Sequence, residues 1–121
     1  MAVTYATDVK NDRMDAVTTQ IGAAGVLEIG TTAMGTVLAS ISLANPAAPG
    51  ASGGVLTFTM PQSDTSADAG GTAAAARITD GTNDVITGLT VGTGSEDIVL
   101  DSVSISAGQT VTISSATITH A

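Results

Sequence analysis

From Val26 onward, apolar residues recur at every second position, and this period of two constrains the fold more than any other feature of the chain. The positions between them are mostly Ser and Thr, which suit the solvated face of a pleated sheet. The clearest runs cover residues 37–43, 56–60 and 74–79; a weaker one covers 85–91, and further runs cover 98–100, 103–105 and 111–119. The pattern predicts seven or eight strands.

Segments rich in Pro, Gly, Asp and Ser separate these runs and are typical of turns. They cover residues 45–54, 62–71 and 80–84. Strands at a spacing of roughly ten residues favour antiparallel architectures. We therefore expect a mainly β fold, an antiparallel β-sandwich or barrel (jelly-roll-like), with one short N-terminal helix.

The alternation breaks its phase at two places. Val111 and Ile113 share one face, whereas Ala116 and Ile118 fall on the other unless one extra residue is inserted near Ser114 and Ser115. A β-bulge is the usual way to insert it. A similar slip at residues 101–102 predicts a second bend or a short turn.

The start of the chain has the period of a helix instead. We expect an amphipathic helix from about Asp8 to Ile21, with Thr7 as its N-cap and Gly22 or Gly25 ending it. The expected apolar stripe consists of Val9, Met14, Val17 and Ile21. This divides the chain into two parts. Residues 1–25 form an N-terminal arm and helix, which we expect to serve as a docking or packing element, and residues 26–121 form a β-sandwich domain.

The charge balance excludes several classes of function. Eleven acids face three cations, Lys10, Arg13 and Arg77, which gives a net charge of −8 and makes DNA or RNA an improbable partner. The chain has no Cys, so disulfides and thiolate metal sites are excluded. It contains neither a signal-peptide pattern nor an apolar run long enough for a membrane helix, so we expect no membrane partner.

Acidic residues in the turns could in principle bind a cation. Asp80, Asn83 and Asp84 offer oxygens of the kind that calcium prefers. However, Asp-Gly between two strand-like runs is already explained by a hairpin turn, and this interpretation is favoured. Asp64 and Asp68 could bind an ion weakly, although solubility of the loop is the better explanation.

No arrangement of residues indicates catalysis. Glu96 and Asp97, near Asp101, could form an acid–base pair, but adjacent acids usually point to opposite sides of a strand, and no aromatic platform for a sugar is present. His120 lies next to the C-terminus, and the surroundings of Ser114 and Ser115 do not resemble a nucleophile elbow. Gly92-Thr93-Gly94 and Gly70-Gly71 lack the Lys of a phosphate loop. We expect no catalytic residue, no cofactor and no metal.

The sequence nevertheless resembles a family of small structural proteins of tailed bacteriophages and prophages. The resemblance extends over nearly the whole chain, and members commonly have no defined function. It is carried by residues 12–17 (DRMDAV), 27–31 (LEIGT), 73–78 (AAAARI), 88–93 (GLTVGT), 97–100 (DIVL), 107–113 (AGQTVTI) and 118–120 (ITH).

The resemblance implies a non-enzymatic virion component, and we expect a capsid decoration, or cement, protein on the capsid exterior, made in the host cytoplasm. Its expected partners are the major capsid protein and further copies of itself, as a homotrimer. A core built from small residues suits a protein that is stabilised partly by association. The residues expected to contact the capsid or another partner are Tyr5, Val9, Lys10, Arg13, Met14 and Val17.

Two alternatives stay open. The first is a tail-associated structural protein, such as a tail-tip, tail-tube or fibre module. The second is a module that binds carbohydrate on the host surface, which would normally present several exposed aromatic residues, whereas this chain has only Tyr5 and Phe58. For Tyr5 itself, packing within the molecule is slightly favoured over docking into a partner.

Overall fold

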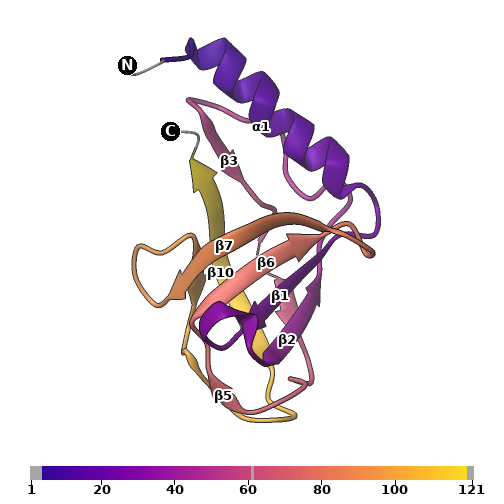
Figure 1. The fold of residues 1–121 in the computed structure, drawn as a ribbon, viewed down its shortest axis with the longest axis vertical. Coiled ribbons are helices and arrows are strands. Elements are labelled where there is room, and N and C mark those ends of the chain that lie inside the picture. The colour runs from indigo at the N-terminus through magenta and orange to yellow at the C-terminus, as the bar shows by residue number, and fades with distance from the viewer. Residues whose placement is uncertain (1–3, 61, 120–121) are drawn as a thin grey trace.

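The computed structural model describes residues 4–60 and 62–119. It contains an N-terminal helix and a strongly curled sheet, with the helix lying across one end of the sheet (Figure 1). The helices and strands are α1 (Thr7–Ile21), β1 (Val26–Gly30), η1 (Thr32–Met34), β2 (Val37–Ser42), β3 (Val55–Thr57), β4 (Gln62–Asp64), β5 (Gly71–Thr72), β6 (Ala75–Thr79), β7 (Asp84–Gly92), β8 (Ile98–Leu100), β9 (Ser104–Ile105) and β10 (Val111–Thr119).

The main sheet has eight strands in the order β2-β1-β6-β7-β8-β10-β3, with β4 also pairing with β10. Strands β5 and β9 form a small ribbon at the end of the molecule opposite α1 (Figure 1). All of these pairs are antiparallel except β7 with β8. The predicted mainly β fold with one short N-terminal helix is confirmed, in the form of a half-barrel made by one curled sheet.

Alternation places one face of each long strand in the core. In β1, Leu27 pairs with Ile41 on one side and with Ile78 on the other, and all three are fully buried. Burial of such side chains contributes about 1.5–3 kcal/mol each. The described buried residues form one cluster, which contains aliphatic residues from every long strand together with Phe58.

The alternation identified β2, β6, β7 and β10, but β1 is not among the predicted runs, and the short polar strands were missed. β4 lies inside the segment predicted as a loop, residues 62–71, and β5 begins at its last residue, so that prediction is wrong. β4 has no apolar period; it is held by its pairing with β10, which includes a 2.9 Å hydrogen bond between the hydroxyls of Ser63 and Thr112. The predicted run 74–79 also begins one residue early, because β6 starts at Ala75 and Ala74 is exposed.

Both predicted breaks of phase are confirmed. In β10 the register with β8 shifts between Ile113 and Ser115, so that Ile113 and Ala116 can both be buried. The chain also bends at Asp101, between β8 and β9. Each break moves the apolar residues that follow it back to the core face.

Helix α1 begins and ends close to the predicted residues. It ends at Gly22, whose φ of +68° favours glycine and whose N–H donates to the carbonyl oxygen of Thr18. The predicted N-cap is wrong: Ala6 occupies that position, without a side-chain capping bond, and Thr7 is the first helical residue. Met14 and Ile21 join the core of the sheet, so α1 is packed onto the β-structure.

The turn between β1 and β2 contains two residues in the left-handed region, Ala33 (φ +57°) and Met34 (φ +58°). This conformation costs L-residues roughly 1–2 kcal/mol each. Met34 compensates by packing on Gly30, where an added Cβ would lie 2.9 Å from the Met34 Sδ. Glycine at position 30 thus leaves the room that this turn requires.

Candidate functional site

The outer side of α1 is the most distinctive surface of the described chain. Among residues 4–60 and 62–119, the large hydrophobic side chains that are exposed are Tyr5 and Val9, at 41% and 42%. Tyr5 lies just before α1, and Val9 lies in its first turn. Large exposed apolar residues that gather in one place point to a contact surface more than scattered ones do.

The structure separates the six predicted contact residues into two groups. Tyr5, Val9 and Arg13 are exposed, and the Arg13 guanidinium lies 4.5 Å from the centre of the Tyr5 ring. Met14 is only 5% exposed and belongs to the core, so the prediction that it contacts a partner is corrected. Residues three or four apart share one face of a helix, so Met14 lies on the same face as Val17 and Ile21.

The remaining two predicted residues are intermediate. Val17 is half-buried and packs against the core, again because the helical period turns it toward the sheet. Lys10 is also half-buried, and its aliphatic chain lies over Gly54, where an added Cβ would be 3.3 Å from the Lys10 Cδ. The outward group of the predicted set therefore consists of Tyr5, Val9 and Arg13.

Two polar side chains anchor the inner side of α1 to the segment that precedes β3. Asp15 Oδ1 accepts a hydrogen bond of 2.7 Å from the Ala51 N–H, and Asn11 Oδ1 accepts one of 2.9 Å from the Gly54 N–H. Sequence reasoning missed both anchors, because their partners lie 36 and 43 residues away along the chain. They fix which side of α1 faces solvent.

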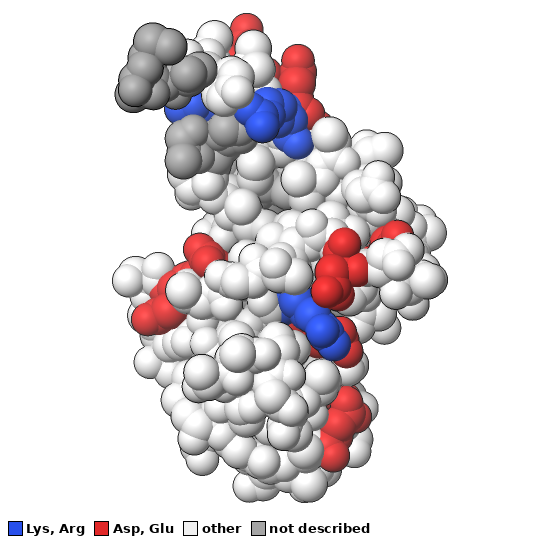
Figure 2. All heavy atoms as spheres, viewed as in Figure 1, with Lys and Arg blue, Asp and Glu red and all other residues white. Residues whose placement is uncertain are grey.

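Charge is divided between the two flanks of that outer side. With 3.6 residues per turn, Val9, Ala16 and Gln20 lie along one line of the exposed side, about 130° around the helix from Met14 and Ile21. All three are exposed. Asp8 and Asp12 lie on one flank, and Arg13, followed by Lys10, lies on the other. The ion pairs found among the described residues do not involve Lys10 or Arg13. Figure 2 shows basic atoms gathered at the helix end of the molecule.

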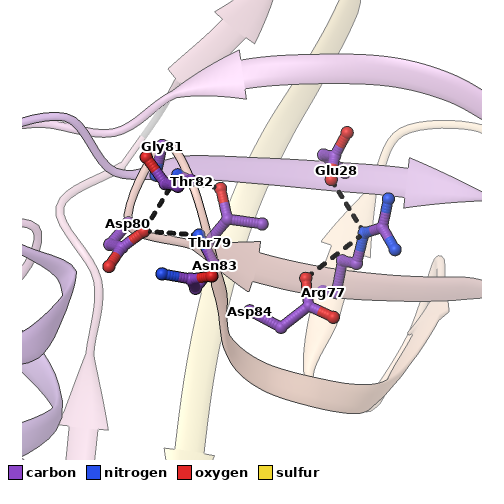
Figure 3. A network of polar contacts seen from close by, with 8 residues as sticks. All are labelled: Glu28, Arg77, Thr79, Asp80, Gly81, Thr82, Asn83 and Asp84. Carbon is purple, nitrogen blue, oxygen red and sulfur yellow. Dashed lines mark hydrogen bonds and ion pairs between the residues drawn. The ribbon is translucent and has the colours of Figure 1, made fainter.

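The loop considered for calcium is a hydrogen-bonded turn. Asp80 Oδ1 accepts from the N–H groups of Asn83 (2.7 Å) and Thr82 (2.9 Å), and the Asp80 N–H donates to the Asn83 carbonyl (Figure 3). The backbone hydrogen bonds from Asn83 and Thr82 hold the pKa of Asp80 below its ordinary value. The favoured turn interpretation is confirmed.

Asp84 belongs to a different group, on the exposed side of the sheet. The Arg77 Nε donates to Glu28 Oε1 at 2.7 Å and lies 3.9 Å from Asp84 Oδ1 (Figure 3). The hydrogen bond to Glu28, followed by the charge of that carboxylate, raises the pKa of Arg77 above its ordinary value. Arg77 and Glu28 are directly opposite in the β1–β6 register, so this pair ties two neighbouring strands together.

Glu96 and Asp97, considered as an acid–base pair, hold the connection between the two parallel strands. Asp97 Oδ2 accepts from the Thr90 N–H at 3.1 Å, and the Thr90 hydroxyl accepts from the Asp97 N–H at 3.0 Å. Glu96 Oε1 accepts from the Gly94 N–H at 3.0 Å. Parallel strands normally need a crossover of a dozen or more residues. These side chains stabilise a much shorter loop, residues 93–97.

Asp64 and Asp68 connect the loop after β4 to the edge of β2. Asp64 Oδ2 accepts from the Ser40 N–H at 3.1 Å, and Asp68 Oδ2 accepts from the Ser40 hydroxyl at 3.3 Å. Asp64 Oδ1 also accepts from the Ser66 N–H. These carboxylates thus satisfy polar groups on a strand edge that has no strand partner on that side.

The other candidate residues do not form a reactive centre in the described chain. Ser114 donates from its hydroxyl to the Val99 carbonyl at 3.2 Å, and His120 lies outside the described residues. Within residues 4–60 and 62–119 there is no pocket and no group of three or more acidic or histidine side chains placed to bind a metal. Of the helices that the structure describes, none has the length and apolar character needed to cross a membrane.

Comparisons with known proteins provide no relative. The chain matches no protein family, no curated protein and no solved structure.

Proposed function

We propose that this chain is a non-enzymatic structural protein of a phage or prophage particle, which binds the outer surface of the capsid and stabilises junctions between capsomers as a decoration protein. The observation that carries the proposal is a contrast in the use of polar groups. Four of the eight acidic side chains that follow α1 bond to the chain's own backbone, whereas α1 leaves apolar and charged side chains exposed on its outer side.

That use of carboxylates argues against chemistry. A catalytic acid or base needs a free oxygen and a pKa tuned to its task within a site that holds substrate. Asp64, Asp80, Glu96 and Asp97 instead accept hydrogen bonds from backbone N–H groups of their own loops or of a neighbouring strand. The proposal accordingly includes no cofactor and no metal.

A decoration protein adds contact area at junctions and requires no active site. Its proposed partners are the major capsid protein and further copies of itself, and its proposed location is the capsid exterior. The resemblance to small phage structural proteins supports this choice over a host-surface sugar-binding module. Such a module would stack sugars on exposed aromatic rings, whereas Phe58 is only 2% exposed.

The test is the position of the chain in particles produced by the phage or prophage that encodes it. Cryo-EM maps of wild-type particles and of particles that lack the gene should differ by density at capsomer junctions. Gold-labelled antibodies against the chain should bind the heads. Label confined to tails would overturn the proposal in favour of a tail component, and absence from the particles would overturn both.

Deletion of residues 2–21 would not be a clean test of binding to the capsid. Such a deletion would remove Met14 and Ile21 from the core and the anchors of Asn11 and Asp15. It would therefore destabilise the sheet together with any contact. Empty capsids from the deletion strain, incubated with purified wild-type protein, should regain the density at capsomer junctions.

A further inference from the structure

The outer face of α1 combines an exposed centre with two flanks of opposite charge. Here this face means the central residues Val9, Ala16 and Gln20, together with Asp12 on one flank and Arg13 on the other; all five are exposed. Relative to the line through Val9 and Ala16, Asp12 and Arg13 lie at nearly equal angles to either side, because each residue advances the helix by about 100°. They also lie almost level, one residue apart.

We infer that this face binds the same face of a second copy of the chain, with the two α1 helices parallel around a rotation axis. Rotation about an axis parallel to the helices brings the basic flank of one copy beside the acidic flank of the next. Arg13 then faces the partner's Asp12 on both sides of the contact. Val9 of each copy lies near the axis, where it meets its equivalent.

The alternative direction of packing is disfavoured by the same charges. In a symmetric antiparallel pair of helices, each flank lies beside the same flank of the second copy. The two Arg13 side chains are then on one side of the contact, and the two Asp12 side chains are on the other. Like charges at a contact are destabilising, whereas opposite charges fix its register. The segregation of charge on α1 therefore selects the parallel arrangement.

A second copy fits this face better than the remaining surface of the chain does. In the described residues, large exposed apolar side chains occur only at Tyr5 and Val9, so Val9 finds an apolar counterpart on a second copy only at the same end of α1. Isologous or cyclic contacts of this kind are the usual way in which soluble proteins form closed oligomers. The inference goes beyond the proposed function, because it concerns the purified protein and stands whether or not the chain is found on capsids.

Cross-linking tests the contact directly. The chain has no Cys, so Val9→Cys introduces the only thiol and can form a disulfide only between copies. Under mild oxidation, Val9→Cys should give at least about tenfold more covalent dimer than Ala107→Cys, an exposed control in a turn, which corresponds to about 1.4 kcal/mol. Equal yields from the two variants would overturn the inference.

The direction of packing has its own test. In an antiparallel arrangement centred on the middle of α1, each residue lies beside the residue at the same distance on the other side of that middle. Val9 would therefore lie near Gln20 of the second copy. A mixture of Val9→Cys and Gln20→Cys should therefore give less mixed dimer than Val9→Cys alone gives of its own dimer. A mixed dimer in excess would overturn the parallel geometry.

Charge exchange then tests the pairing. Arg13→Asp places two acids against each other and should weaken self-association, measured by sedimentation equilibrium, by about tenfold or more. Asp12→Arg combined with Arg13→Asp exchanges the flanks and should restore it. Failure of the double variant to recover would contradict the pairing. The inference would also be contradicted if Val9→Asp abolished binding to the capsid but left self-association unchanged, because this face would then contact the capsid.

Discussion

The curled sheet and helix α1 use polar and apolar residues in opposite ways. In the sheet the aliphatic side chains point into one core, and carboxylates such as Asp80 and Asp97 bond to nearby backbone. In α1 the inner side is attached in the same manner through Asp15 and Met14, but the outer side leaves Val9 and Arg13 exposed. The sheet thus uses most of its apolar side chains within the molecule, whereas the outer side of α1 is exposed to solvent.

This difference separates residues that stabilise the molecule from residues available to a partner. A buried or backbone-bonded side chain should affect the free energy of unfolding when it is changed. An outward side chain should affect association alone. The predictions below test this division.

The largest effect is expected in the core of the sheet. Ile113→Ala on β10 should lower the free energy of unfolding by about 2–5 kcal/mol, because Ile113 is fully buried and its removal leaves a cavity. The matched control, Ser115→Ala, changes an exposed residue of the same strand and should stay within about 0.5 kcal/mol of wild type. Urea denaturation measures both; similar losses in the two variants would contradict the assignment of the core.

A smaller effect is expected where α1 is anchored. Asp15→Ala removes the carboxylate that accepts from the Ala51 N–H and should cost about 1–3 kcal/mol, since a charged acceptor is lost and a partly buried donor is left without its partner. Asp12→Ala, on the exposed flank of the same helix, is the control and should cost less than about 0.5 kcal/mol when it is measured at low protein concentration, where self-association does not contribute. If the two variants are equally stable, the helix does not depend on this anchor.

Local periodicity was sufficient to predict most of the fold. The alternation of apolar residues found β6 and β10, and the break near Ser114 was visible as a change of face within β10. The polar strand β4 could not be found in this way, because it is held by hydrogen bonds to β10 rather than by burial. The parallel pairing of β7 with β8 also depends on side chains of the loop, which carry no periodic signal.

The exposed side of α1 was predictable only in part. Of the residues expected to contact a partner, Tyr5, Val9 and Arg13 are exposed, but the sequence could not fix the inner side of α1, and so the set also included Met14 and Val17. The anchor at Asp15 pairs with a loop far along the chain, and no pattern of spacing in one sequence reveals such a pair. The division of charge between the flanks became meaningful only once the outer side was known.

The turn at Asp80 should make stability depend on pH. Backbone hydrogen bonds hold the pKa of Asp80 below its ordinary value, so the turn is stabilised fully above the unfolded-state pKa of about 3.9 and less as the pH falls through the lower folded-state pKa. Asp80→Asn keeps a carbonyl acceptor but does not titrate. The difference in unfolding free energy between wild type and Asp80→Asn should therefore shrink between pH 7 and pH 2. A constant difference would show that the charge of Asp80 is immaterial to the turn.

The smallest effect on stability is expected on the outer face of α1. Val9→Asp replaces an exposed apolar side chain and should leave the free energy of unfolding within about 0.5 kcal/mol of wild type, whereas Met14→Asp places a charge in the core and should unfold the protein or destabilise it strongly. The two variants put the same side chain on opposite sides of one helix, so differences in helix propensity largely cancel between them. Thermal unfolding at low protein concentration keeps self-association out of the measurement. A large loss of stability in Val9→Asp under those conditions would mean that Val9 is packed within the molecule, and the outer side of α1 would then not be available to a partner.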